Sequence, residues 1–175
     1  MTSYRVTRRM TKSASSLLVA MILLAATAQA QAQAQCVEVT TQNESIVRRA
    51  FDNWIKGGSN IFAELLASEV RWTIHGSGPV AGTYFGLKDF VERASVPLVS
   101  RLEGPIAPKV HHIWAVGDTV IVRFDGSATT TSGAPYANQF VWIFRMANGV
   151  VIEAEAFLDL VAYQQVVDNN APRTK

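Results

Sequence analysis

The chain of 175 residues contains a single cysteine, Cys36. One cysteine cannot form a disulfide within the chain or a cysteine-clustered zinc site. His111 and His112 are neighbours in a predicted strand, so we expect their side chains to point to opposite faces and not to form a ligand pair. A metal centre needs at least three converging ligands, and we expect neither a metal nor a cofactor. A glycine-rich phosphate loop and a Gly-x-Ser-x-Gly elbow are also absent.

Acidic residues are missing from the first 35 positions, which hold four basic ones. The formal charge is +2 for the whole chain, but the residues after position 35 comprise 12 basic and 14 acidic ones, a formal charge of −2. The basic excess therefore belongs to the leader. The remaining chain lacks the basic surplus that nucleic-acid binding requires, so we expect no nucleic-acid partner.

Residues 1–34 are predicted to be a signal peptide with its cleavage region. The apolar run at residues 17–26 is short for a bilayer span, and Ala28-Gln29-Ala30 offers the small-x-small cleavage pattern. The alternating repeat that follows leaves cleavage open after Ala30, Ala32 or Ala34. We expect a secreted, periplasmic mature protein without membrane attachment; an uncleaved anchor and a twin-arginine route are the alternatives. The basic residues of the leader are Arg5, Arg8, Arg9 and Lys12.

Helices are predicted first along the mature chain. Thr41 and Glu44 fit a capping box, apolar residues recur at helical spacing to residue 55, and Gly57-Gly58 ends the helix. A short helix is predicted at 61–67, with Ser59 or Asn60 as its cap. A third is predicted at 87–98, kinked or ended by Pro97.

Strands dominate the remainder. The predicted hairpin turns are Gly117-Asp118 and Asn148-Gly149. A helical turn at 161–167 and a frayed, flexible tail at 169–175 complete the chain. Helices before a long antiparallel meander predict one α+β domain at residues 41–168, with three N-terminal helices packed in the hollow of a curved, mostly antiparallel sheet. The predicted strands are residues 70–75, 82–86, 110–116, 119–128, 136–146 and 150–158.

Six short motifs occur in a characteristic order and spacing. They are Trp72-Thr73-Ile74-His75-Gly76, residues 81–86, residues 115–120, Asn138-Gln139-Phe140, residues 144–149 and Phe157-Leu158-Asp159. With them the chain resembles the SnoaL-like branch of the nuclear transport factor 2-like superfamily, which includes ketosteroid isomerases, polyketide cyclases and limonene-epoxide hydrolases. The resemblance covers residues 42–168 and implies a cone-shaped α+β barrel around an apolar pocket.

The catalytic positions that the resemblance implies are largely vacant. The position of the isomerase base holds Thr73, and that of its oxyanion aspartate holds Trp142; its tyrosine falls near Ala50 or Phe51. Arg123-Phe124-Asp125 resembles the Arg-x-Asp pair of the epoxide hydrolases, which places Arg123 and Asp125 inside the cone. Their second aspartate, however, falls on Ala156.

Two classes of function remain open. The first is a secreted domain that binds a small apolar ligand without transforming it. The second is an acid–base enzyme, an isomerase, cyclase, dehydratase or epoxide hydrolase, that uses His75 with Arg123 and Asp125. The candidate catalytic residues are His75, Arg123, Asp125 and Asp159. The candidate ligand-binding residues are Trp54, Trp72, Thr73, Tyr84, Asn138, Phe140 and Trp142.

A homodimer is also predicted. Alternation along the strands predicts an apolar sheet face opposite the pocket, and a soluble monomer does not normally expose so large an apolar area. The residues expected on that face are Val120, Val122, Phe124, Val141 and Ile143.

Overall fold

The computed structural model describes residues 11–58 and 60–173. The chain divides into two units, Met1–Glu38 and Val39–Lys175, and the described part of the first is helical. The leader arginines Arg5, Arg8 and Arg9 and the alternative cap Ser59 lie outside the described residues. Among the helices that are described, none is long and apolar enough to cross a membrane.

The first helix, α1, spans Thr11–Ile55. Thr41 therefore lies inside the helix, and the predicted helix start at Thr41 is wrong for the full-length chain. The alanines and glutamines before it are good helix formers and continue the helix toward the N-terminus. Glu44 pairs with Arg48 one turn later, at 2.6 Å between Oε1 and the guanidinium. The predicted end is confirmed, because Gly57 leaves the helix with a φ of +77°.

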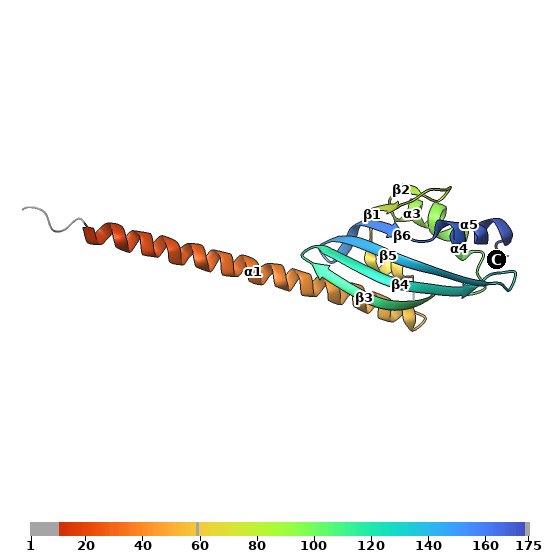
Figure 1. The fold of residues 1–175 in the computed structure, drawn as a ribbon, viewed down its shortest axis with the longest axis horizontal. Coiled ribbons are helices and arrows are strands. Elements are labelled where there is room, and N and C mark those ends of the chain that lie inside the picture. Colours follow the sequence, from red (N-terminus) through yellow and green to blue (C-terminus); the bar gives the residue numbers. More distant parts are fainter. Residues whose placement is uncertain (1–10, 59, 174–175) are drawn as a thin grey trace, which may run out of the picture. The chain divides into compact units, whose positions relative to one another are not determined.

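Six strands form one curved, unclosed sheet in the order β2-β1-β6-β5-β4-β3 (Figure 1). The four-stranded antiparallel meander predicted for the second half is confirmed, and only the β1–β6 pair is parallel. At its last hairpin Asn148 and Gly149 have φ values of 52° and 80°, as a tight primed turn requires. The strands are β1 (Leu66–Ile74), β2 (Gly82–Phe85), β3 (Ala107–Val116), β4 (Thr119–Thr129), β5 (Pro135–Ala147) and β6 (Val150–Phe157).

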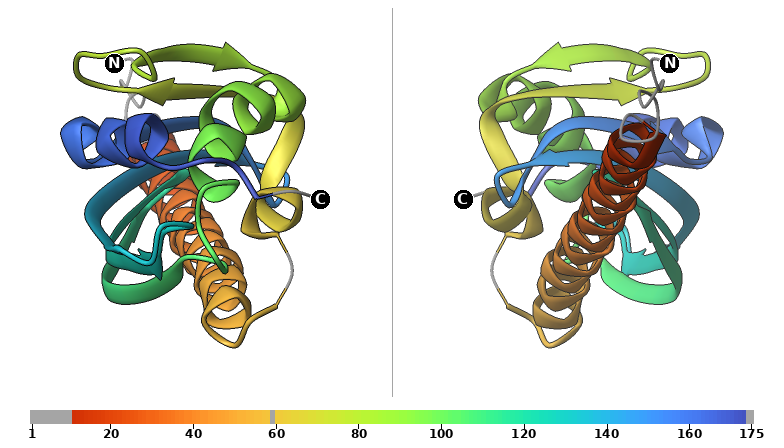
Figure 2. Two further views of the ribbon diagram at one scale, coloured as in Figure 1. Left: turned by 90° about the vertical axis from the view of Figure 1, so that its right-hand side faces the viewer. Right: turned by 90° about the vertical axis from the view of Figure 1, so that its left-hand side faces the viewer.

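Short helices accompany α1 along the concave side of the sheet, whose hollow holds the C-terminal part of α1 (Figure 2). Asn60 caps α2, as predicted, by accepting a hydrogen bond from the Phe62 amide. The predicted helix at 87–98 does not end before Pro97 but widens into a π-helical turn, η1. The bounds are α2 (Ile61–Leu65), α3 (Leu87–Phe90), η1 (Val91–Ser95), α4 (Val96–Val99) and α5 (Leu160–Asn169).

The sheet has an inner face turned toward α1 and an outer face turned away from it. On β4 the side chains of Val120, Val122 and Phe124 are fully buried on the inner face. Their predicted place in an exposed dimer face is therefore wrong. Burying three apolar side chains against α1 is strongly favourable, so strand alternation turns Arg123 and Asp125 outward.

The end of the chain is tied to the domain as far as Arg173. The backbone amide of Arg173 donates to the Ser100 carbonyl oxygen, and Thr131 Oγ1 donates to the Ala171 carbonyl oxygen. Arg101 Nε donates to the Asn170 carbonyl oxygen. Asn170, Ala171 and Arg173, in the segment expected to fray, thus have hydrogen-bond partners in the domain; residues 174–175 lie outside the described part.

Candidate functional site

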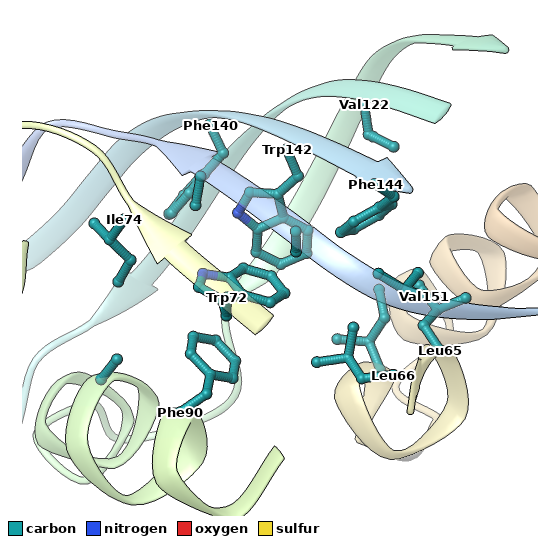
Figure 3. Close-up of a cluster of buried hydrophobic side chains, with 14 of the residues drawn as sticks. Leu65, Leu66, Trp72, Ile74, Phe90, Val122, Phe140, Trp142, Phe144 and Val151 are labelled. Atoms are coloured by element: carbon teal, nitrogen blue, oxygen red, sulfur yellow. The ribbon is translucent and has the colours of Figure 1, made fainter. Parts of the chain in front are cut away.

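An apolar cavity of about 460 Å³ lies between the inner face of the sheet and the helices. That volume is within the usual range of small-molecule sites. Trp72 and Ile74 of β1, Phe140 and Trp142 of β5 and Phe90 of α3 come together at this end of the core (Figure 3). The cavity therefore continues the hydrophobic core instead of forming a surface cleft apart from it.

Aromatic rings make a large part of the wall and contact one another. Trp54 of α1 stacks on Trp142 with ring centroids 6.1 Å apart and an interplanar angle of 5°. Trp72 stacks on Phe90 at 4.1 Å and 17°, and its ring meets that of Trp142 edge-on at 5.3 Å. Offset-stacked and edge-to-face pairs are the favoured aromatic arrangements, so these rings stabilise one another in the wall.

The π-helical turn η1 brings a further part of the wall into place. Val91, Ala94 and Ser95 all line the cavity, as does Val96 at the start of α4. The Val96 amide donates to the Val91 carbonyl oxygen, five residues earlier. Pro97 has no amide hydrogen for a regular α-helical bond, so the wider turn accommodates it without ending the helix. π-turns of this kind occur frequently at functional sites.

Polar groups are rare on this wall. Tyr163 is the only lining residue with an ionisable side chain among those that the structure describes. Its hydroxyl donates to the Ala94 carbonyl oxygen at 2.8 Å, and burial raises the pKa of Tyr163. The hydroxyl is therefore a fixed neutral donor. The indole nitrogen of Trp72, by contrast, is buried without a hydrogen-bond partner.

Four predicted ligand-binding residues lie on the cavity wall: Trp54, Trp72, Phe140 and Trp142. Tyr84 does not line it. Its ring is buried against Phe90, its hydroxyl donates to the Val80 carbonyl oxygen at 2.8 Å, and burial raises its pKa. Tyr84 is thus a core residue.

Thr73 and His75 lie on the outer face, so their predicted place in the pocket is wrong. Trp72 and Ile74 take the inner positions of β1 because they are the apolar pair, which leaves the alternate residues outside. Thr73 Oγ1 lies 3.0 Å from Thr83 Oγ1 on β2. His75 Nε2 lies 2.7 Å from a Glu155 carboxylate oxygen, and its ring stacks on Phe157.

Arg123 and Asp125 also lie on the outer face, against the prediction that they sit inside the cone. The Arg123 guanidinium donates to Asp125 Oδ1 at 2.6 Å, and His111 Nε2 lies 2.7 Å from Asp125 Oδ2. His111 and Arg123 hold the pKa of the Asp125 carboxyl below its usual value. Arg123 and Asp125 border a half-open groove of about 700 Å³, which Lys109 and Phe157 also line.

A β-bulge changes the prediction for the two adjacent histidines. The β3–β4 register shifts between Val110 and His112, so one extra residue bulges out of the ladder. His111 contacts Asp125 on the outer face, and His112 stacks on the exposed ring of Trp114. Both histidines are therefore exposed on one face. No group of three metal-ligating side chains occurs among the described residues.

Asn138 and Asp159 connect β5 to the start of α5. Asn138 Nδ2 donates to the Tyr136 hydroxyl and the Asp159 carbonyl oxygen, and Asn138 Oδ1 accepts from the amides of Gln139 and Asp159. The Asp159 carboxylate caps α5 by accepting from the amides of Val161 and Ala162. Asn138 has all its hydrogen bonds made within the fold, and neither residue lines the apolar cavity.

Sequence reasoning missed several lining residues. Ile74 shares the face of Trp72, because alternate residues of a strand lie on one side, and this signal was available. Phe90 and Ala94 belong to the apolar stripe of the predicted third helix. No sequence pattern indicated that Tyr163 lines the cavity, because α5 is brought to the cavity only by the tertiary fold. The other lining residues that were missed include Phe62, Val91, Leu98, Ile106 and Leu158.

Comparison with known proteins finds one matching domain family and several solved structures of similar fold. The model of the SnoaL-like domain family matches residues 47–154. No match to a curated protein was found. Among solved structures, a protein of Jannaschia sp. CCS1 with the provisional name SnoaL-like polyketide cyclase is 22% identical with a TM-score of 0.59, covering 76% of this chain and 96% of its own.

Two further structures show the same fold. Bal32a from a soil-derived mobile gene cassette is 22% identical with a TM-score of 0.60, covering 73% of this chain and 97% of its own. TerC, crystallised with polyporic acid, is 20% identical with a TM-score of 0.58, and the match covers 73% of this chain and 99% of TerC.

The outer-face position of Asp125 predicts a pH-dependent stability effect. Its folded-state pKa is depressed by His111 and Arg123, so the ionised carboxylate stabilises the fold above its unfolded pKa of about 3.9. This contribution is lost as the pH falls through the depressed folded value. Asp125→Asn should lower the melting temperature at pH 7, and the difference from wild type should close in acid. Asp52→Asn on α1 removes the same charge at an exposed position and serves as the control. A difference in melting temperature between Asp125→Asn and wild type that does not change with pH contradicts the prediction.

Proposed function

The chain belongs to the SnoaL-like domain family, and from its cavity we propose that the domain binds a small, flat, largely apolar molecule without transforming it. The main support for this proposal is the composition of the cavity wall. Trp54, Trp72 and Trp142 contribute apolar aromatic surface to a half-open volume large enough for such a molecule. Apolar burial drives binding in sites of this kind, and aromatic faces favour planar ligands.

The placement of the acid–base groups supports binding over catalysis. A general acid or base must reach the substrate within hydrogen-bond distance, directly or through one water. His75 and Asp125 belong to the outer face, and Asp159 caps a helix. The positions that the family resemblance associates with acids hold Trp142 and Ala156, both at the cavity wall. The enzyme alternative with His75, Arg123 and Asp125 therefore lacks contact with the apolar cavity.

Proteins of similar structure support a function with small molecules in general. TerC was crystallised with polyporic acid, and the Jannaschia protein is named for polyketide cyclase chemistry. Ligand binding and isomerase or cyclase activity are both consistent with this fold, since one fold hosts many functions. The wall chemistry of this chain is the reason for choosing ligand binding.

Filling part of the cavity should weaken ligand binding. N-phenyl-1-naphthylamine, a neutral apolar dye, should bind one site per chain with a rise in fluorescence. Ala94→Leu adds bulk to a buried wall position and should weaken dye binding about fivefold or more, the effect of roughly 1–3 kcal/mol of overpacking. Ala137→Leu, an exposed change on β5, should leave it unchanged. Equal binding by both variants would place the dye elsewhere.

Export of the domain is the second part of the proposal. Its support is the order of basic residues, apolar run and small-residue cleavage pattern in residues 1–34. Changing Arg8, Arg9 and Lys12 to glutamate should leave an uncleaved precursor in the cytoplasm, detected by the mass of the accumulated protein. Arg8→Lys with Arg9→Lys keeps the charge, so processing should persist unless the twin-arginine route is used. Normal processing of the glutamate variant would contradict export by this leader.

A homodimer through the outer face is the third part. Val141 and Ile143 lie on this face, half-buried in the single chain, and Trp114 and Phe157 are 51% and 42% exposed. Light scattering should give twice the chain mass at micromolar concentration. Ile143→Lys should yield monomers, because dimerisation would bury the lysine charge in the interface. Val161→Lys, at an exposed position of α5, should remain dimeric. A monomeric wild-type protein would rule the dimer out.

A further inference from the structure

The indole N–H of Trp72 is an unused hydrogen-bond donor in the core. Trp72 is 1% exposed, and its Nε1 is the only buried side-chain polar atom without a partner among the described residues. Folded proteins pair nearly all such groups, because burying an unpaired donor destabilises the fold. An orphaned donor in a cavity wall therefore calls for an explanation.

The surroundings of Trp72 hold its ring in one orientation. Phe90 stacks on its face at 4.1 Å, and Phe62 and Trp142 meet it edge-on at 5.6 and 5.3 Å. In Figure 3 the nitrogen lies at the edge of the ring on the side of Ile74 and Phe140, both of which line the cavity. The buried donor therefore lies on the side of the ring where these two cavity-lining residues are.

The neighbouring wall offers no obvious acceptor. The side chains of Ile74, Phe90 and Phe140 are hydrocarbons, and the Tyr163 hydroxyl is committed as a donor to the Ala94 carbonyl oxygen. A molecule in the cavity can complete the missing hydrogen bond with an oxygen of its own. No lysine, arginine or histidine lines the cavity among the described residues, so a neutral acceptor fits better than a carboxylate, whose burial would be uncompensated.

We propose that Trp72 determines specificity by donating its Nε1–H to a carbonyl oxygen at the edge of a planar, neutral ligand. The inference rests on the proposed binding function and narrows it to planar carbonyl compounds. A carbonyl brings an acceptor alone, whereas a hydroxyl also brings a donor for which the apolar wall has little use. The aromatic rings of the wall favour a planar frame, and Trp72 supplies the hydrogen bond to the carbonyl oxygen.

A matched pair of probes isolates this hydrogen bond. Fluorene and 9-fluorenone share a planar three-ring frame, and only the second carries a carbonyl oxygen. Competition against N-phenyl-1-naphthylamine should show 9-fluorenone binding about fivefold more tightly, the effect of one net hydrogen bond of about 1 kcal/mol. Trp72→Phe should bring the affinity ratio close to one while retaining fluorene binding. Trp54→Phe, which changes another wall tryptophan, should leave the ratio unchanged.

A second measurement does not depend on the variant folding. In ¹⁵N-labelled wild-type protein the Trp72 indole N–H resonance should move downfield with 9-fluorenone and much less with fluorene, because only the ketone oxygen can accept its hydrogen bond. Equal affinity for the two probes, with no selective shift, overturns the role of Trp72 and leaves the cavity as a binding site. Absence of binding by both probes and the dye overturns the proposed function and this inference with it.

Discussion

The contact between α1 and the inner face of the sheet is the interaction on which the rest of the domain depends. Phe51 of α1 is 1% exposed and meets the ring of Phe124 at 5.2 Å and that of Trp142 at 5.9 Å. Trp54 lies three residues after Phe51, so both side chains are on the same face of α1. There the ring of Trp54 stacks on that of Trp142. The cluster that fixes the helix in the hollow of the sheet is therefore the cluster that forms one wall of the cavity.

This contact also decides where charge can lie. Once Phe124 and Trp142 face α1, strand alternation places Arg123, Asp125 and Arg145 on the outer face. There they form ion pairs in contact with water, such as Arg145 with Glu153 at 2.6 Å. Unpaired charges on the inner face would carry a large desolvation cost. The domain is consequently divided into an apolar interior suited to binding and a polar exterior that carries the titratable groups.

Local sequence signals were enough to predict most of the helices and strands, but not the start of α1 or the orientation of every strand. The Asn148-Gly149 turn and the end of α1 at Gly57 follow from backbone chemistry that acts within a few residues. The orientation of β1 and β4 was predicted wrongly because candidate acids at His75 and Asp125 were given more weight than the apolar alternation of the same strands. The bulge that exposes both His111 and His112 depends on pairing with β4, which no local pattern encodes.

The cavity and the unpaired donor are both costs to the empty fold. An unfilled volume forfeits the dispersion contacts that its wall would otherwise make, and the Trp72 indole forfeits a hydrogen bond. Larger side chains at Ala94 and Ala156, both of which line the cavity, are an obvious way for a sequence to reduce the first cost. A ligand reduces both costs at once, and because it binds the folded state alone, it raises stability in proportion to the logarithm of its concentration. The features that make the unliganded domain less stable are thus the ones that would give the proposed planar carbonyl ligand its binding energy and its orientation.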